Sequence, residues 1–257
     1  MRFKWYGTAT LLFESGSTRL LFDPYCKKYA DSAPVPLEEA RTADAIFITH
    51  AHLDHFCDVD IFSEGVRPVY VSQAGIALVQ KNGLADACMH PIAAGDEVHI
   101  GAFTVRAFPA RHCRFDLLTV LRVLFSPRTW LHFHDAVSLL DHATKFRIRR
   151  NDVLAFEISD GQTNALIFGS ADLVPHTDYP RNADLLVFPY QGRTRPQKKL
   201  ARILQVTNPK CVAIDHFDDA FPPITYRVGT QKFAPTVKSV LPQATAILTQ
   251  QNVWYDV

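Results

Sequence analysis

A short apolar run that ends in a dense cluster of histidine and aspartate constrains this chain more than any other feature. Residues 45–49 (AIFIT) are apolar and rich in strand formers, which is typical of a strand buried on both faces. The next six residues, 50–55 (HAHLDH), hold four side chains of metal-binding type. In open α/β architectures, ligand sites lie where core strands end. The stretch therefore predicts a central strand with a metal site at its carboxyl end.

The spacing inside this cluster favours two neighbouring metal ions over one. His50 and His52 lie two apart on an extended segment, so both imidazoles point to the same side and can bind one ion. Asp54 and His55 follow where we expect a helix over about 54–65, and they can face a second position. Imidazole and carboxylate are ordinary ligands of zinc and similar divalent metals. The alternative is a polar loop of titrating histidines, because short motifs give false positives.

Composition limits the class of protein and its compartment. The chain has 257 residues, 47% of them hydrophobic, which is enough for one large domain or two small ones. A formal net charge of +1 gives no global field that attracts nucleic acid or an anionic membrane. No apolar run can span a bilayer, and residues 1–16 lack the pattern of a secretory signal. The five scattered cysteines include no C-x-x-C pair, so we expect reduced thiols and a cytoplasmic protein.

The rest of the chain alternates hairpins and helices in two similar stretches. Residues 3–13 and 18–22 have the pattern of two strands joined by a turn. Hairpins followed by strand–helix alternation occur in roughly 1–113 and again in 151–257, which indicates two packed sheets with helices outside. Residues 114–150 differ, because large apolar residues recur there with helical spacing. We interpret them as an insertion of one or two helices.

Three further predicted strands also end in a candidate ligand. These ligands are His112, Asp172 and His216. Each of them alone is more often an ordinary buried or surface residue. Together with the cluster at 50–55, they place seven side chains at the same kind of topological position, and a pair of metals with shared ligands needs about this many. The sequence therefore predicts that these strand ends converge on one metal-binding cleft.

In this order, the motifs resemble those of the metallo-β-lactamase-fold hydrolases. The matching segments are THAHLDH (49–55), PARHC (109–113), GSAD (169–172) and DHFDDAF (215–221). Residues 7–24 are also similar to the first hairpin of that superfamily, especially in the L-ascorbate-6-phosphate lactonase-like branch. The resemblance implies an α/β (α+β) fold, an αββα sandwich of two mixed β-sheets packed face to face with helices outside. It further implies one domain over 1–257 that carries the helical insertion at 114–150.

The resemblance assigns a role to each ligand. His50, His52 and His112 would hold a first metal, Asp54, His55 and His216 a second, and Asp172 would bridge the two. Asp54, His55 and Asp172 would thus be the catalytic residues, and a metal-bridging hydroxide would attack the substrate. Because the set contains no thiolate, we expect two divalent ions, Zn²⁺ first, with Mn²⁺ or Fe²⁺ as alternatives. Oxidoreductases of the superfamily carry an acidic residue in place of His52, which disfavours electron transfer here.

Two nearby features leave alternatives open. Asp218 and Asp219 follow His216, and they either bind its other ring nitrogen or cap the next turn. The insertion at 114–150 follows His112 directly, so we expect it to wall the cleft. Its apolar residues line a pocket, pack as core or form a homo-oligomer contact, and we favour core or dimer.

The substrate is predicted only by class. Arg114 and Arg122 make the insertion locally basic, and arginine binds phosphate or carboxylate bidentately. A small anionic ester, lactone or phosphodiester is therefore the leading hypothesis, with a solvated helix face as the alternative role of these arginines. The rival enzyme is a lipid phosphodiesterase of the N-acyl-phosphatidylethanolamine phospholipase D type, which the apolar insertion favours. The rival from another class is a metal-containing ligand sensor, which a complete ligand set disfavours.

Overall fold

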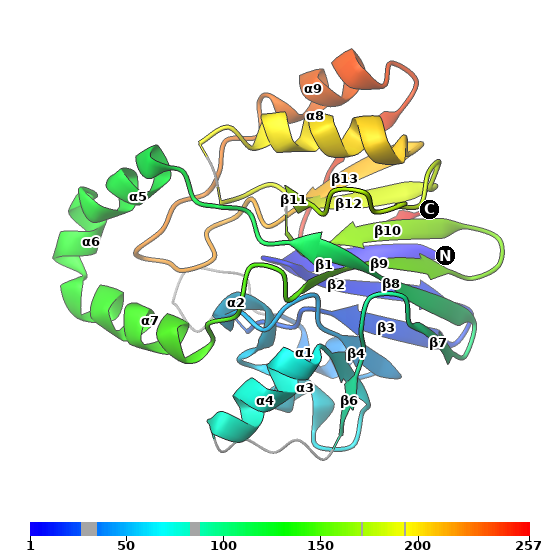
Figure 1. Ribbon diagram of the computed structural model, residues 1–257, viewed down its shortest axis with the longest axis horizontal. Helices are drawn as coiled ribbons and strands as arrows, with labels where there is room; N and C mark the ends of the chain where they lie inside the picture. The colour runs from blue at the N-terminus through cyan, green and yellow to red at the C-terminus, as the bar shows by residue number, and fades with distance from the viewer. Residues whose placement is uncertain (27–34, 83–87, 171, 193) are drawn as a thin grey trace.

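Two mixed β-sheets lie face to face at the centre of the protein, with helices on their outer faces (Figure 1). This computed structural model describes residues 1–26, 35–82, 88–170, 172–192 and 194–257. The predicted αββα sandwich is confirmed. None of the helices in these ranges has the length and apolar content needed to cross a bilayer.

The first sheet contains the predicted central strand. Its strand order is β15-β1-β2-β3-β4-β5-β6 among the described residues. The strands are β1 (Arg2–Gly7), β2 (Thr10–Ser15), β3 (Thr18–Phe22), β4 (Ala45–Phe47), β5 (Val69–Val71), β6 (Met89–Pro91) and β15 (Trp254–Asp256). β4 runs parallel to β3 and β5 and is fully buried, as the apolar run at 45–49 predicts. Its carboxyl end delivers the histidine cluster.

The second sheet delivers the other predicted ligands. Its order is β11-β8-β9-β10-β12-β13-β14, with β7 paired to β8. The strands are β7 (Glu97–Ile100), β8 (Phe103–Arg111), β9 (Val153–Ser159), β10 (Asn164–Phe168), β11 (Asp172–Leu173), β12 (Leu185–Pro189), β13 (Cys211–Asp215) and β14 (Thr245–Leu248). β8, β9 and β10 are antiparallel, whereas β10, β12, β13 and β14 are parallel. His112 therefore follows β8, and His216 follows β13.

Aromatic packing joins the sheets. Phe22 and Phe47 of the first sheet contact Phe156 of the second, with ring centroids 5.9 and 5.6 Å apart. All three rings are fully buried. Since side chains alternate across a strand, Ile46 and Ile48 point to the opposite face, where they pack in a second cluster beneath helices. The strand that carries the histidine cluster is thus fixed on both faces.

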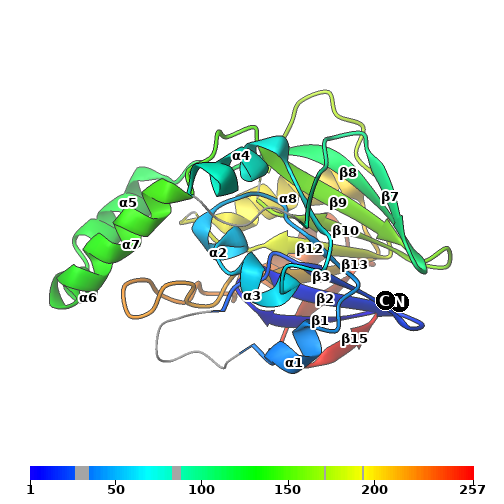
Figure 2. The ribbon, with the colours of Figure 1, turned by 90° about the horizontal axis from the view of Figure 1, so that it is seen from below.

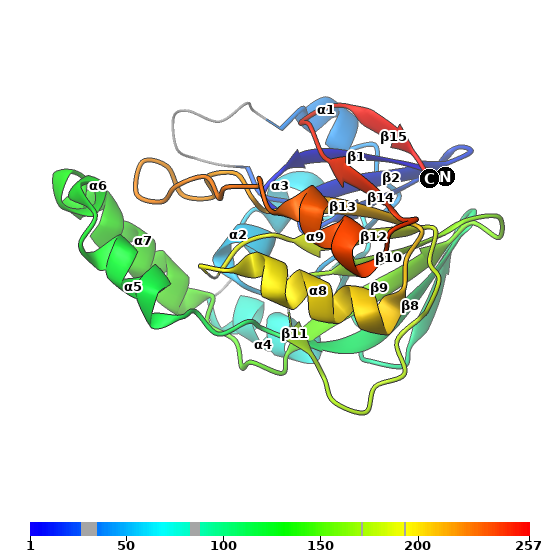
Figure 3. The ribbon, with the colours of Figure 1, turned by 90° about the horizontal axis from the view of Figure 1, so that it is seen from above.

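Helices cover the outer face of each sheet (Figures 1 and 3). Beside the first sheet lie α1 (Leu37–Ala40), α2 (Leu53–Phe56), α3 (Val59–Ser63) and α4 (Gln73–Lys81). Beside the second lie α8 (Pro196–Thr207) and α9 (Phe233–Val240). The remaining helices, α5 (Leu117–Leu124), α6 (Pro127–Leu131) and α7 (Phe133–Lys145), project away from both sheets in all three views (Figures 1, 2 and 3).

The projecting helices contradict one expectation for the insertion. No residue of α5, α6 or α7 is buried, so the prediction that their apolar residues pack as core of this chain is wrong. The physical reason is placement, since the helices extend past the end of the sandwich and away from both sheets (Figure 2).

Two predicted elements are divided in the structure. Residues 3–13 form not one strand but the β1–β2 hairpin, because Gly7 and Thr8 adopt φ values of +122° and +48° that reverse the chain. The helix expected over 54–65 is split into α2 and α3. It ends where Glu64 and Gly65 take positive φ values of +50° and +69°. The first division places Thr8 at a hairpin tip, where it contacts the site.

Candidate metal centre

The strand ends converge on one site, as predicted. The ligand atoms of His50, His52 and His112 all lie within 4.8 Å of one another. Those of Asp54, His55 and His216 form a second group by the same measure. The groups adjoin, because the His50 and His55 ring centroids are only 3.9 Å apart. Residues from both sheets and from α2 thus build two neighbouring ligand groups.

Hydrogen bonds orient the first group so that ring nitrogens stay available. The Thr49 hydroxyl donates to Asp23 Oδ2 at 2.5 Å, so its oxygen is left to accept from His50 Nδ1, 3.0 Å away. The Nδ1 of His112 donates to the carbonyl of Cys113 at 2.8 Å. Both rings therefore carry their proton on Nδ1 and present an Nε2 lone pair. Among the described residues, His50 Nε2 is buried and has no hydrogen-bond partner, which fits a metal ligand.

Asp23 positions the second group, and sequence reasoning missed it. Its carboxylate accepts from the backbone N–H of Thr49 at 2.7 Å and from Nδ1 of His55 at 2.8 Å. His55 therefore turns Nε2 towards Asp54. A carboxylate that holds the far nitrogen of a ligating imidazole is the usual support of a metal site. Its position in the sequence could have identified Asp23, because it directly follows β3 just as the predicted ligands follow their strands.

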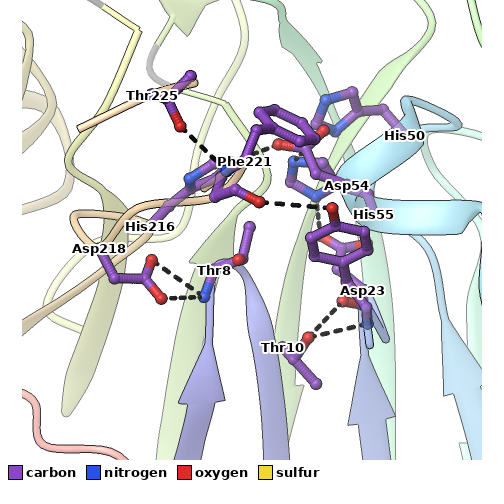
Figure 4. Close-up of polar contacts among 12 residues, drawn as sticks. Thr8, Thr10, Asp23, His50, Asp54, His55, His216, Asp218, Phe221 and Thr225 are labelled. Carbon is purple, nitrogen blue, oxygen red and sulfur yellow. Dashed lines mark hydrogen bonds and ion pairs between the residues drawn. The ribbon is translucent and has the colours of Figure 1, made fainter. Parts of the chain in front are cut away.

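His216 is held by the β1–β2 hairpin (Figure 4). Its backbone has φ +53° and donates to the Thr8 carbonyl at 2.7 Å. Its Nε2 lies 3.0 Å from Asp54 Oδ2, and its buried Nδ1 has no hydrogen-bond partner in the described structure. Asp218 accepts from the Thr8 N–H at 3.0 Å, and Asp219 accepts from Thr225. Asp218 therefore supports His216 through the backbone of Thr8, whereas Asp219 holds the following turn.

The electrostatics favour the metal-binding protonation states of the first group. Burial, reinforced by neighbouring His112, lowers the pKa of His52 to about 4. Burial likewise lowers the pKa of His50. For Asp54, burial favours the neutral acid, but His55 and His216 outweigh it and the net pKa of the carboxyl is lowered. Neutral imidazole and ionised carboxylate are the forms that coordinate divalent ions. In the second group, burial lowers the pKa of His55 but Asp23 and Asp54 outweigh it and the net pKa is raised, so metal binding there must displace a proton.

Asp172 belongs to neither ligand group. Its carboxylate accepts from Lys199 Nζ and from Arg150, each at 2.7 Å. Arg150 also donates to the backbone carbonyl of His112 at 3.1 Å. Arg150 therefore links the Asp172 carboxylate to the backbone of a residue in the first group. Residue 171 of the GSAD segment lies outside the described residues. The bridging role of Asp172 stays a prediction.

The predicted substrate arginines lie outside both ligand groups. Arg114 is exposed after the end of β8. Arg122, on α5, lines a pocket of about 630 Å³ together with apolar residues and Tyr226. A role of either arginine in substrate binding stays a prediction.

Known proteins resemble this chain in sequence and in fold. Residues 18–211 match the family model described as a Beta-lactamase superfamily domain. A UPF0173 metal-dependent hydrolase of Salinibacter ruber is 30% identical over 112 residues, which are 44% of this chain and 49% of that protein. The chain thus spans about half the length of this curated relative.

Two solved structures match over nearly their whole length. YhfI of Bacillus subtilis, a metallo-beta-lactamase fold protein, has a TM-score of 0.60 at 17% identity, covering 99% of this chain and 98% of YhfI. Igni18, a metallo hydrolase of Ignicoccus hospitalis, has a TM-score of 0.62 at 14% identity, covering 100% and 98%. These likenesses establish the fold, and the family match covers most of the sequence. The chain therefore belongs to the β-lactamase superfamily domain family and has the metallo-β-lactamase fold.

Proposed function

We propose that this protein is a metal-dependent hydrolase. The observation that carries the proposal is the pair of adjoining ligand groups, whose imidazoles are oriented by hydrogen bonds on the opposite ring nitrogen. That pattern costs side-chain freedom and buries His50 Nε2 without a partner, and metal binding explains both features. The curated relative described above carries the same activity in its name.

The residues supply the ligand set that the chemistry needs. His50, His52 and His112 would hold one ion, and Asp54, His55 and His216 a second. Nitrogen and carboxylate oxygen donors suit zinc first, with manganese and iron as alternatives. When bound, divalent ions supply Lewis acidity that polarises a carbonyl or phosphoryl oxygen and activates water at neutral pH.

Asp54 and Asp23 have distinct tasks in this proposal. The Asp54 carboxylate is kept ionised by His55 and His216 despite burial, so it can accept a proton or a hydrogen bond from the attacking water. Asp23 is a positioning residue, because it holds His55 and the turn before His50 without facing the substrate. Both residues keep the ligands in place before substrate arrives.

The finer proposal is cleavage of an ester, lactone or phosphodiester bond in a small anionic molecule. Arg150 and Lys199 support the anionic character, since both cations pair with Asp172 and Arg150 also contacts the backbone of His112. The five scattered cysteines, with no C-x-x-C pair, support a reducing, cytoplasmic location. A lipid phosphodiesterase is the second candidate, and the exposed apolar residues of α5–α7 favour it.

A substrate panel on metal-loaded protein tests the proposal. Metal content is measured first, and then turnover of a nitrophenyl ester, an aliphatic lactone and bis-nitrophenyl phosphate. We expect turnover of at least one substrate, with a loss of about a hundredfold or more in His52→Ala. His99→Ala is the matched control, since His99 is exposed on β7. Metal-loaded protein that is inactive on the whole panel would instead favour the ligand sensor.

A further inference from the structure

The helical arm, residues 114–146, exposes a concentration of large apolar side chains. Leu131 is 79% exposed, Phe125 76% and Leu117 71%. Trp130, Phe133 and Leu140 are also more than half exposed. Surfaces of monomeric proteins rarely gather so many apolar side chains unless the surface meets a partner.

The longest helix of the arm is amphipathic in a way that identifies its outer face. On α7, Phe133, Val137 and Leu140 recur at spacings of four and three, and all three are exposed. Asp141 and Lys145 follow Val137 at spacings of four, so they border the apolar stripe, and they form an ion pair at 2.8 Å. An apolar stripe beside charged residues is the pattern of helices that lie in a membrane interface.

The charge of the chain is unevenly divided, which its overall sum conceals. Residues 114–150 contain seven arginines and lysines against three aspartates, a net charge of +4, whereas the arm itself (114–146) contains four against three, a net charge of +1, because Arg147, Arg149 and Arg150 follow it. The whole chain carries +1, so the remainder carries −3. The excess of positive charge therefore lies where the arm joins the body, and an anionic surface complements it there. The small net charge of the whole chain therefore conceals a local excess of positive charge at the base of the arm.

A basic pocket lies at the base of the arm. It has a volume of about 390 Å³ and is lined by Arg195, Lys198, Lys199 and Arg202 of the α8 region, with Asp116, Leu118 and Thr194. The Asp116 carboxylate is engaged there by Thr119 and Thr194. Leu118 also lines the apolar pocket between α5 and Tyr226. Basic and apolar surfaces are thus continuous, which matches a phosphate headgroup above acyl chains.

We infer that the helical arm docks on a bilayer of anionic phospholipid. The apolar stripe enters the acyl boundary, and the arginines of the arm and the basic pocket contact headgroup phosphates. A short series of contacts would connect the docked arm to the metal centre. Ser126 and Tyr226 hydroxyls lie 2.7 Å apart, and Arg128 donates to the Thr225 carbonyl at 3.1 Å. The loop that follows His216 is therefore fastened to the arm.

Vesicle binding tests the inference without any measurement of turnover. The full chain is sedimented with vesicles of phosphatidylcholine alone and of phosphatidylcholine with an equal share of phosphatidylglycerol. We expect binding to the mixed vesicles to be roughly tenfold tighter or more, and to weaken with salt. Equal binding to both vesicles, or no binding to either, overturns the inference. A protein that fails on vesicles and yet hydrolyses a soluble substrate refutes docking and leaves the proposed function standing.

Matched variants locate the contact. Leu131→Asp combined with Leu140→Asp is expected to lower binding to mixed vesicles at least about tenfold. Val66→Asp is the control, because Val66 is 75% exposed on the body. Lys198→Glu with Arg202→Glu should also weaken binding, whereas Lys232→Glu should not. A double aspartate variant that binds like wild type contradicts the inference. So does one that only converts a dimer into monomers, since the arm would then meet a second copy.

Tryptophan fluorescence of the wild-type protein tests docking even where the charged variants fail to fold. Trp130 is 66% exposed, whereas Trp5 is buried. Lipids brominated on their acyl chains should quench the fluorescence of wild type on mixed vesicles. Trp130→Phe should remove most of that quenching without releasing the protein from the vesicles. Quenching that persists unchanged in Trp130→Phe would contradict docking through the arm.

Discussion

The Nδ1 atom of His55 lies 2.8 Å from Oδ2 of Asp23, although His55 lies on α2 and Asp23 follows β3. The same carboxylate accepts from the N–H and the hydroxyl of Thr49, which in turn contacts His50. One buried aspartate therefore orients a ligand in each of the two groups. Its loss should disturb both metal positions together.

Asp23→Asn tests that relationship. The amide keeps the shape of the side chain, but an NH₂ group replaces one carboxylate oxygen. That group donates hydrogen bonds and cannot accept one from His55. We expect metal affinity to fall by about ten- to a hundredfold, the range found when outer-shell partners of ligating histidines are removed. Competition with a chromogenic chelator measures this affinity. Asp184→Asn is the control, because Asp184 pairs with Lys210 and Asn164 on another strand end. Equal affinities in both variants would contradict the role of Asp23.

Single ligand deletions test whether the two groups bind separate ions. His52→Ala removes a ligand only from the first group, and His216→Ala only from the second. We expect each variant to retain about one ion fewer per chain than wild type, because three protein ligands are the usual minimum for a held catalytic metal. Elemental analysis after gel filtration gives the stoichiometry. If both variants keep the full wild-type metal content, the assignment of the groups is wrong.

Asp172→Asn tests the predicted bridge. A carboxylate that joins two ions should, when neutralised, lower metal content and activity together. Lys199→Ala provides the comparison, since it removes a cation from the same carboxylate and leaves Asp172 freer to bind metal. We therefore expect metal affinity to decrease in Asp172→Asn and not to decrease in Lys199→Ala. Reduced thermal stability of Asp172→Asn with unchanged metal content would assign Asp172 to the ion pairs alone.

The sequence predicted the site better than its surroundings, for physical reasons that particular residues illustrate. His50, His112 and His216 each follow an apolar strand, and strand ends of packed sheets meet by geometry alone. Asp23 was missed because its partner His55 is 32 residues away and joined only by the fold. The Gly7–Thr8 turn was missed because strand-forming residues flank it on both sides. The arm was misjudged because an apolar helical pattern does not say whether its partner is the same chain.

Glu14, which lies far from the ligand groups, should make the stability of the fold depend on pH. It lies on β2 directly opposite Arg2 on β1 and Arg19 on β3, and it accepts from their Nε atoms at 2.7 and 2.6 Å. Burial alone would raise its pKa, but the two guanidinium groups outweigh burial and the net pKa is lowered. The stabilisation is therefore present above the unfolded-state pKa of about 4.3 and is lost as pH falls through the lower folded-state value.

Glu14→Gln isolates this contribution. At pH 7 we expect the variant to lose about 1–2 kcal/mol in the free energy of unfolding, a modest value because both arginines remain partly exposed. Below the folded-state pKa of Glu14 the difference between the two proteins should shrink towards zero, because the wild-type carboxyl is then protonated as well. Urea unfolding of wild type and variant, compared across a series of buffers, gives the difference directly. A gap between the two proteins that stays constant from neutral to acidic pH would show that packing, and not the charge of Glu14, stabilises the three strands.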